Sequence, residues 1–525
     1  KLPVWFDMLD EAHIQTLVRF AEQLEARNIQ CIGILDHPPA RYRENFGTGD
    51  VQLYAYHYFR DTEVWEPLLE PVLTRLGMKI RWFQLGAEND TSLQNEEDLP
   101  AAVATIRQHM QAYAQELQLA LPWDWLDPLP QPIDELTWDA TQFSTKPPLT
   151  SQELPRYVGA VHSQKKQTWT RLDPLPKSQY GLYTRVLDLV QRMIEVRRSN
   201  VAAAFVYNPF AEQTGLFTPD GKVSDMLIPW QNCTQAVGQG EYVGSIEMPR
   251  SSVNHIFANE DDGVMVVWNP DEVVEQLYLG NELSGRDIWG RPVAIESLTV
   301  HGGTQQRIAV SRWPAFISGV DVDIVRWRQS FELLTSHVEN RLGVAPVVRM
   351  KAVSAFDEVV TGKVSLTCET LLNGSNASLP FQIAPGQEAT WEMPLPLKPD
   401  ASAGKHRLQF EFEIQGRQLY RFRLYREVYL GSGDIELRFD AVRENDHLVR
   451  IQVEANNHTD GPLSFDCRVF SPGAPYQRFQ LVNLPPGTTE RKIRLVIDDA
   501  GQPVERWFRC EQIGANRVLN YRVKF

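Results

Sequence analysis

The first 210 residues alternate between short apolar runs and longer segments in which apolar residues recur every three or four positions, and this alternation restricts the fold most strongly. The longer segments predict amphipathic helices; they cover residues 14–24, 64–76, 103–117 and 182–193. The short runs predict buried strands; they cover residues 4–6, 31–35, 80–85, 119–123, 136–138, 168–172 and 201–207. Because parallel neighbours must be joined by crossover connections, successive strand–helix units predict a parallel sheet.

The number of these strands points to a barrel. A closed (β/α)8 barrel needs eight parallel strands, and the pattern provides seven. Either the pattern misses one strand, or the first strand lies upstream of Lys1; the abrupt start of the chain favours the second explanation. An upstream fragment or a partner chain would then complete the barrel. We therefore expect residues 1–215 to form a TIM-barrel-like domain that supplies the C-terminal seven strands.

The pattern changes near residue 210 and again near residue 340. Between these points the sequence is rich in turns and in strand-like runs, such as the apolar run 263–269. Beyond residue 340 alternating runs are separated by Pro and Gly, which is typical of β-sandwiches. The predicted fold class is multidomain α/β plus all-β. After the barrel we expect a small β-rich domain packed on it over residues 216–335, and β-sandwiches over residues 336–430 and 431–525.

Charge and motifs exclude several classes of function. The 525 residues carry 52 Lys and Arg against 67 Asp and Glu, a net charge of −15. So acidic a chain does not attract nucleic acids or anionic membranes through its overall field, and no apolar run approaches the roughly 18 residues that cross a bilayer. Because no phosphate-binding glycine motif and no zinc-ligand spacing occurs, no cofactor and no metal are expected, although an acid-rich rim would tolerate calcium.

The five cysteines are too few and too scattered for a disulfide scaffold. Cys467 and Cys510 both fall in the last hundred residues, so they either pair across a sandwich or remain buried free thiols, and the second reading is favoured. The N-terminal residues lack the basic-then-apolar layout of a signal peptide. The location of the protein is therefore not readable from that end.

Acidic and amide side chains follow the predicted strands throughout the first 210 residues. The carboxyl ends of the strands of a parallel barrel form its active face, so the residues that follow them are the candidates for one shared site: Asp7, Asp36, His37, Glu88, Asn89, Asp90, Asp124, Asp139, Asp173 and Asn208. Aromatic residues stand beside them, among them Trp82, Trp125, Trp169 and Tyr207. A polar loop that contains His57 is a weaker candidate, for which simple solvation is the favoured explanation.

This combination of side chains suits a carbohydrate. Carboxylates can accept hydrogen bonds from sugar hydroxyls and transfer protons, and aromatic rings stack on the apolar faces of sugars. The alternative is that the acids cap the following helices and that the tryptophans fill the barrel. For each acid taken alone, this alternative is favoured. For the whole set of acids, the interpretation as a carbohydrate site is favoured.

One segment is more specific than the others. Residues 82–90 read Trp-Phe-Gln-Leu-Gly-Ala-Glu-Asn-Asp and resemble the fourth-strand motif of clan A glycoside hydrolases, in which a strand ends in Gly-Asn-Glu and the Glu is the general acid/base. If residues 4–6 are the second strand of the barrel, this segment is the fourth, as in that family. The resemblance implies that Glu88 is the general acid/base, and the domain order of barrel, small β domain and sandwiches extends it.

The sequence departs from the family pattern at two positions. Ala87 stands where the family has the Asn that holds the sugar 2-hydroxyl. The family nucleophile is a Glu at the end of strand seven, and the candidate there is Asp173, which is one methylene shorter and precedes Pro174. Asp173 is therefore either a nucleophile, a base for water, or simply a turn former, and the turn is the favoured reading.

Two functions follow from these observations. In the first, the protein is a glycoside hydrolase acting on a polysaccharide, with Glu88 and Asp173 as catalytic residues. The substrate-binding residues would then be Asp36, His37, Trp82, Asp90, Asp124, Trp125, Asp139, Trp169, Tyr207 and Asn208. In the second, the barrel is catalytically inactive and serves as a carbohydrate-binding or structural subunit. A secreted or extracytoplasmic location is favoured.

Overall fold

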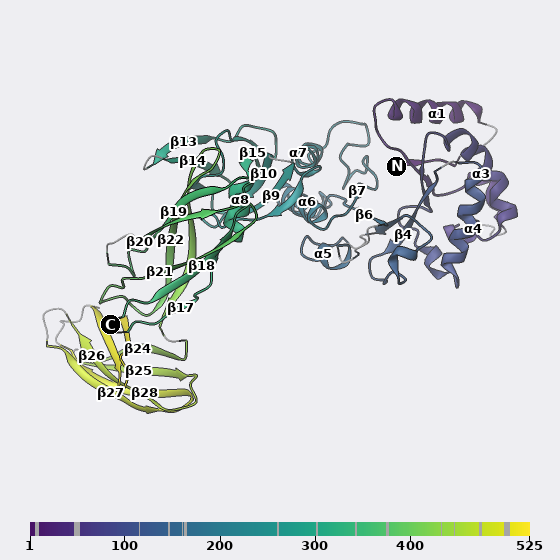
Figure 1. Cartoon of the computed structure of the whole chain (residues 1–525). Coiled ribbons are helices and arrows are strands. Elements are labelled where there is room, and N and C mark those ends of the chain that lie inside the picture. The colour runs from purple at the N-terminus through teal and green to yellow at the C-terminus, as the bar shows by residue number, and fades with distance from the viewer. Residues whose placement is uncertain are drawn as a thin grey trace. The chain divides into compact units, whose positions relative to one another are not determined.

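The computed structural model describes residues 1–525 apart from 6–9, 47–52, 115, 145–147, 160, 162–164, 260–261, 301–302, 342–343, 374–376, 432, 446, 472–474 and 498–503. The chain divides into two units. Their helices and strands are labelled in Figure 1. The first unit comprises Lys1–Tyr242, Arg286–Pro292 and Trp313–Phe316, and the second comprises Val243–Gly285, Val293–Arg312 and Ile317–Phe525. In the described part of the chain, no helix is both long and apolar enough to span a membrane.

The first unit is built on a parallel sheet of seven strands in sequential order. These are β1 (Leu2–Pro3), β2 (Ile32–Leu35), β3 (Trp82–Leu85), β4 (Gln118–Asp124), β5 (Ala140–Ser144), β6 (Gln167–Arg171) and β7 (Ala203–Phe205). The sheet is curled, and the side chain of Lys1, just before β1, lies against the ring of Phe205 on β7, with Nζ 4.1 Å from the ring centroid. Among the described residues β1 and β7 do not pair with each other, so the sheet is a half-barrel and not a closed barrel. The predicted parallel sheet is thus confirmed in this open form.

Two strands differ from their predicted positions. The first strand is Leu2–Pro3 and not residues 4–6; Asp7 lies outside the described residues. The run 136–138 is not a strand, and β5 begins only at Ala140. The apolar residue Trp138 is buried here although it is not in a strand. Its ring is stacked on that of Trp123 with centroids 5.9 Å apart, and its Nε1 donates to Thr141 Oγ1 at 2.9 Å. A buried tryptophan outside any strand therefore gave the same sequence pattern as a short buried strand.

The connections between the strands carry the predicted helices. Four of them overlap the helical segments of the sequence: α1 (Glu11–Glu25), α3 (Thr62–Leu76), α4 (Leu99–Gln111) and α6 (Leu182–Arg198). The helix α4 ends at Gln111, before the predicted end at residue 117. An aspartate side chain accepts a hydrogen bond from the first turn of α1, α3 and α4, and so stabilises the free N–H groups there. Shorter elements complete the connections: η1 (Ala40–Phe46), α2 (Ala55–Tyr58), η2 (Ser92–Asn95), η3 (Ile133–Glu135), α5 (Leu154–Tyr157) and α7 (Leu227–Val237).

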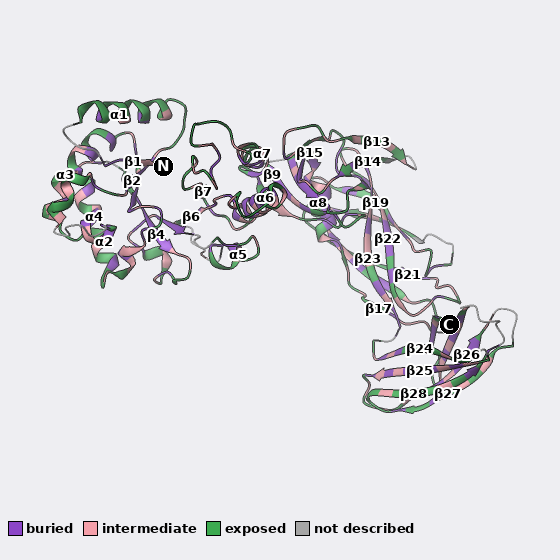
Figure 2. Ribbon diagram, turned by 180° about the vertical axis from the view of Figure 1, so that it is seen from behind, coloured by how far each residue is buried: buried purple, intermediate pink, exposed green. Residues whose placement is uncertain are grey.

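Burial follows the helical period in these connections. On α3 the buried residues recur every three or four positions from Trp65 to Leu76, so one stripe of the helix faces the core. On α1 only Ile14 and Ala21 are buried, and most of this helix is exposed (green in Figure 2).

The second unit consists mainly of antiparallel strands. Its first part contains β9 (Val253–Asn259) paired with β10 (Asp262–Trp268), and a three-stranded sheet of β11 (Val273–Leu277), β14 (Gly303–Val310) and β13 (Ile295–Val300). The strands β8 (Glu241–Gly244), β12 (Ser284–Asp287) and β15 (Ala315–Asp321) belong to the same sheet as β9 and β10, and each of these three strands contains a boundary between the two units. The single described helix of this unit, α8 (Val322–Ser330), follows β15 directly, and the Asp321 side chain caps it by accepting from Ile324 N.

Two sandwiches follow α8. In the first, one sheet contains β16 (Glu332–Leu333), β18 (Val347–Val353) and β21 (Glu388–Pro394), and the other contains β17 (His337–Val338), β23 (Leu419–Leu430), β22 (Gly404–Gln415), β19 (Val360–Thr367) and β20 (Ala377–Ile383). Every second residue of β22 from His406 to Ile414 is buried, which is the period-two pattern of a sheet with one face on a core.

The second sandwich has the same design. One sheet contains β24 (Ile435–Asn445), β25 (Leu448–Asn457) and β28 (Gly487–Val496), and the other contains β27 (Gln477–Leu484), β26 (Leu463–Phe470), β29 (Glu505–Gln512) and β30 (Val518–Lys524). Cys467 and Cys510 lie directly opposite each other on β26 and β29. They are buried free thiols in this structure, with their Sγ atoms 2.9 Å apart.

Candidate functional site

The candidate site begins where β3 ends. Gly86 follows the strand with a φ of 102°, a conformation that glycine adopts without the penalty of a Cβ. A Cβ at this position would also lie 3.0 Å from the Cβ of Ala55. Glycine is therefore required here both by the turn and by the close approach of α2, and the turn leads directly to Glu88.

Glu88 is buried and paired with a lysine. Its Oε1 lies 2.7 Å from Lys1 Nζ, and the two side chains are only 5% and 6% exposed. Lys1 Nζ also donates to Gln84 Oε1 on β3 and to Gln142 Oε1 on β5, each at 2.7 Å. The ammonium group thus has three oxygen acceptors for its three donors, and three parts of the half-barrel meet at one cation.

The electrostatics of this pair are dominated by burial. Desolvation lowers the pKa of the Lys1 side chain, and the charge and hydrogen bond of Glu88 oppose that shift. The second carboxylate oxygen, Glu88 Oε2, is buried and has no hydrogen-bond partner. A buried ion pair of this kind depends on both members, because each charge would be strongly unfavourable alone.

A second group of charges follows β6. Arg171 forms an ion pair with Asp173 and donates from Nη1 to Asn89 Oδ1 at 2.6 Å. Asp173 Oδ1 also accepts from the backbone N–H of Tyr207 at 2.8 Å, and the Arg171 guanidinium lies 4.4 Å from the centroid of the Tyr207 ring. Ser144 Oγ, at the end of β5, donates to Asn89 Oδ1 at 3.2 Å. Arg171 therefore links the segments that follow β3, β6 and β7.

The other acids near β2 and β3 have different environments. Asp36 follows β2 and is half-buried, and desolvation raises the pKa of its carboxyl group. His37 is exposed beside it. Asp90 is buried and accepts backbone hydrogen bonds from Ala55 N at 2.6 Å and Ser92 N at 3.1 Å. Its carboxylate therefore holds the start of α2 and the loop after β3 together.

We expect Asp90→Ala to lower the free energy of unfolding of the first unit by about 2–3 kcal/mol, because two backbone N–H groups lose a charged acceptor in a buried setting. Hydrogen exchange of the α2 amides measures this loss. Asp90→Asn, which keeps an acceptor oxygen, should recover part of it. The matched control is Asp124→Ala: that carboxylate accepts from Leu126 N at 3.0 Å, an exposed bond whose loss is worth about 1 kcal/mol. Equal losses in the two alanine variants would contradict this role for Asp90.

The predicted aromatic residues lie mostly within the sheet. Trp82 is the first residue of β3, at the opposite end of that strand from Glu88. Its ring lies 4.8 Å from that of Trp169 on β6, and Trp169 contacts Phe205 at 5.6 Å. Trp169 is buried and Trp82 is partly buried in this cluster. These rings fill the interior of the half-barrel.

The remaining predicted residues are spread over both edges of the sheet. Asp139 precedes β5, pairs with Arg107 at 2.7 Å and accepts from Leu119 N at 2.8 Å, so it lies at the amino edge. At the end of β4, Trp125 packs edge-on against Tyr157 with ring centroids 4.6 Å apart. Asn208, after β7, accepts from Phe210 N at 3.0 Å. The structure thus brings Glu88, Asp90, Asp173 and Tyr207 to neighbouring loops and leaves Asp139 and Trp82 apart from them.

A pocket of about 400 Å³ lies beside the loop that follows β3. Its lining residues carry phenol rings, an imidazole, amides and hydroxyls: Tyr54, Tyr56, His57, Asn89, Asp90, Thr91, Ser92 and Asn95. The Tyr54 side chain is 39% exposed. Among the described residues, no group of three or more His, Cys, Asp or Glu is arranged to hold a metal ion.

Several residues of the site carried a weak sequence signal. Gln84 and Gln142 are polar residues inside otherwise buried strands, and such residues need partners when they are buried. This signal was available and would have pointed to the interior of the half-barrel. Lys1 and Arg171 carried none, because single basic residues at strand ends are common on protein surfaces.

Comparisons with known proteins give only remote similarities. No family model matches the sequence. No curated protein matches it. A glycosyl hydrolase family 2 member from Bacteroides cellulosilyticus aligns with 97% of this chain and 58% of its own, at 10% identity and a TM-score of 0.27. Native alpha-2-macroglobulin from Escherichia coli aligns with 52% of this chain and 23% of its own, at 11% identity and a TM-score of 0.22.

A red sea bream transglutaminase aligns with 37% of this chain and 31% of its own, at 9% identity and a TM-score of 0.18. This chain therefore spans less than two thirds of the length of each of these three proteins. Similarities of this size do not constrain the function, so the chemistry of the site has to follow from its own residues.

Proposed function

We propose that the first unit is a glycoside hydrolase-like half-barrel, related to (β/α)8 barrels, that binds a glycan without cleaving it. The observation that carries this proposal is that both candidate catalytic carboxylates are already bound to cations. Glu88 is paired with Lys1 in a buried position, and Asp173 is paired with Arg171. A general acid must carry a proton within reach of the leaving oxygen, whereas Glu88 Oε1 accepts a hydrogen bond from the Lys1 ammonium.

Both carboxylate oxygens of Asp173 are also engaged in contacts within the protein. One of its oxygens accepts from Tyr207 N and the other is paired with Arg171. A nucleophile needs a free lone pair facing the sugar, and a base needs one facing a water. These contacts make Asp173 a residue that positions the loops after β6 and β7.

The pocket beside the β3 loop supports binding. It combines hydroxyl and amide groups, which can exchange hydrogen bonds with sugar hydroxyls, with the exposed ring of Tyr54, on which the apolar face of a sugar can stack. The oxygens of Asn89 and Asp90 already accept hydrogen bonds within the protein, so the hydroxyl of Thr91 and the amide of Asn95 are the polar groups offered to a glycan. Together these groups make the loop after β3 the glycan-binding surface.

We expect calorimetric titration with a panel of soluble polysaccharides to give saturable binding that Tyr54→Ala weakens about tenfold, since stacking and burial of a ring are worth about 1–2 kcal/mol. The matched control is Tyr180→Ala: Tyr180 is 42% exposed and does not line the pocket. Prolonged incubation with the bound glycan should release no new reducing ends. The absence of any glycan binding would contradict the proposal.

A hydrolase is the second candidate, and one observation favours it: Glu88 Oε2 has no hydrogen-bond partner. If this oxygen serves as the acid/base, the protein should release reducing ends and Glu88→Gln should abolish that release while leaving glycan binding intact. That result would replace the binding function with a catalytic one.

A further inference from the structure

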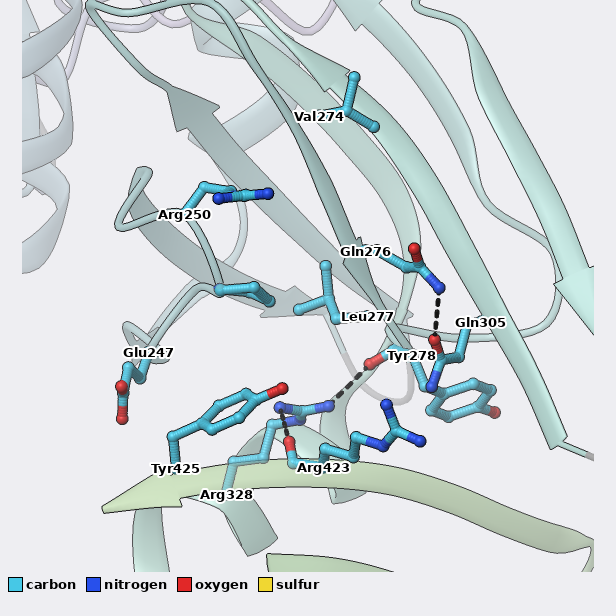
Figure 3. A pocket seen from close by; sticks show the side chains of 11 residues that line it. Glu247, Arg250, Val274, Gln276, Leu277, Tyr278, Gln305, Arg328, Arg423 and Tyr425 are labelled. Carbon is cyan, nitrogen blue, oxygen red and sulfur yellow. Dashed lines mark hydrogen bonds between the residues drawn. The ribbon is translucent and has the colours of Figure 1, made fainter. Parts of the chain in front are cut away.

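The second unit contains a cavity of about 330 Å³ in which positive charge is concentrated. Its lining comes from the segment before β9, from β11, β14, α8 and β23 (Figure 3). Three arginines line it: Arg250, Arg328 and Arg423. Glu247 is the single carboxylate among the lining residues, and it is already engaged by Arg407 at 2.9 Å and Arg426 at 3.6 Å. The cavity is therefore cationic in a chain whose net charge is −15.

Arg328 is the most buried of these arginines. It is only 5% exposed, and its guanidinium donates to the backbone carbonyls of Arg423 at 3.0 Å and Tyr278 at 3.1 Å. Its Nε is buried and has no hydrogen-bond partner. No carboxylate in the described part of the chain forms an ion pair with it. Burial lowers the pKa of Arg328 to about 10, so the group still carries its charge at neutral pH.

Arg423 is also incompletely paired. Its Nε atom is buried without a hydrogen-bond partner, and it forms only a long ion pair, 3.7 Å from Nε to Glu411 Oε2. In Figure 3 the guanidinium of Arg328 lies between the hydroxyl of Tyr425 and the guanidinium of Arg423. Arg328 is buried, whereas the Arg423 side chain is 29% exposed. The removal of the Arg328 charge from water is unfavourable unless an opposite charge compensates for it. An anion in the cavity would supply that compensation.

We propose that this cavity binds a ligand through an oxyanion group, a carboxylate, sulfate or phosphate, held between Arg328 and Arg423. Guanidinium groups recognise such groups by paired hydrogen bonds. The Tyr425 hydroxyl and the amides of Gln276 and Gln305, which also line the cavity, are placed for polar substituents of the ligand. This proposal does not depend on the glycan-binding function of the first unit.

The alternative role for Arg328 is purely structural, as a clamp on two backbone carbonyls. The test therefore uses Arg423, which donates no side-chain hydrogen bond to the backbone among its described contacts. The probes are sodium sulfate, sodium phosphate and sodium glucuronate, titrated calorimetrically into the full chain at constant ionic strength set by chloride. Sulfate and phosphate test a tetrahedral anion, and glucuronate tests a carboxylate carried by a sugar.

We expect at least one probe to bind with 1:1 stoichiometry and Arg423→Gln to weaken it about tenfold or more, as expected for the loss of one charged hydrogen-bond partner. The matched control is Arg421→Gln. Arg421 lies two residues away on the same face of β23 and pairs with Glu413 at 2.9 Å outside the cavity. The Arg421→Gln variant removes the same charge as Arg423→Gln, and it should leave the affinity for the probe within twofold of the parent.

Arg328→Lys keeps the positive charge but loses the paired donors of the guanidinium group. If this variant folds, it should weaken binding of the anion probe by a similar factor. Equal affinities of the parent and Arg423→Gln would overturn the proposal. It would also be overturned if none of the three probes binds, or if Arg421→Gln and Arg423→Gln lose affinity equally.

Discussion

Lys1→Met is expected to lower the free energy of unfolding of the first unit by about 3–5 kcal/mol, the loss typical of removing one member of a buried ion pair. The methionine fills much of the same volume, so the loss arises from charge and not from a cavity. Glu88 would remain 5% exposed with one oxygen that has lost its cation and another that has no partner. Gln84 and Gln142 would each lose the donor that their Oε1 accepts from.

A double variant separates charge from packing. Lys1→Met combined with Glu88→Gln removes both charges, and we expect it to recover more than half of the loss, because a neutral amide is far less unfavourable in a buried site than an unpaired carboxylate. Hydrogen exchange of the β3 and β5 amides measures the stability of the first unit within the full chain.

The matched control for this pair is a surface lysine. Lys79 pairs with Glu22 at 2.8 Å, but these side chains are 26% and 50% exposed, so Lys79→Met should change stability by about 1 kcal/mol or less. A loss of the same size in Lys1→Met and Lys79→Met would mean that the Lys1–Glu88 pair is solvated in solution.

The sequence predicted the α/β half well because local pattern and tertiary packing agree there. On α6, Val186, Leu189, Val190 and Met193 are buried at helical spacing, although Leu182 at the start of the helix is 42% exposed. On α3, Val72 and Leu76 are buried, whereas Val64 and Leu68 are only partly buried. The error at residues 136–138 shows the limit of the pattern. The burial of Trp138 is real, but a single ring buried from a turn produces the same signal as a strand.

The site was harder to predict because the sequence shows which residues follow a strand but not what they contact. Asp90 and Asp139 both follow predicted strands and were therefore expected at the active face of the barrel. In the structure Asp90 accepts hydrogen bonds from two backbone N–H groups, and Asp139 pairs with Arg107 at the amino edge of the sheet. The cation that pairs with Glu88 belongs to Lys1, which is 87 positions away along the chain. The two residues are close in space because the sheet is curled. The roles of the predicted site residues and the domain boundaries at residues 215, 335 and 430 stay predictions.

The second large effect is expected in the core of the first sandwich. Trp327, on α8, is fully buried, and its ring centroid lies 5.8 Å from those of Phe381 and Phe412 and 5.9 Å from that of Phe356. Trp327→Ala would remove the ring at the centre of this cluster and leave a large cavity. We expect a loss of about 3–5 kcal/mol in the free energy of unfolding of the second unit.

Trp327→Phe is the informative control, because the indole Nε1 is buried without a hydrogen-bond partner and its removal leaves no partner unsatisfied. We expect roughly half the loss of the alanine variant, and calorimetry of the full chain measures both. Since Trp327 is followed by Arg328 on the same helix, the alanine variant should also weaken anion binding in the cavity, whereas the phenylalanine variant should retain it. Unchanged stability of Trp327→Ala would show that α8 does not anchor this core.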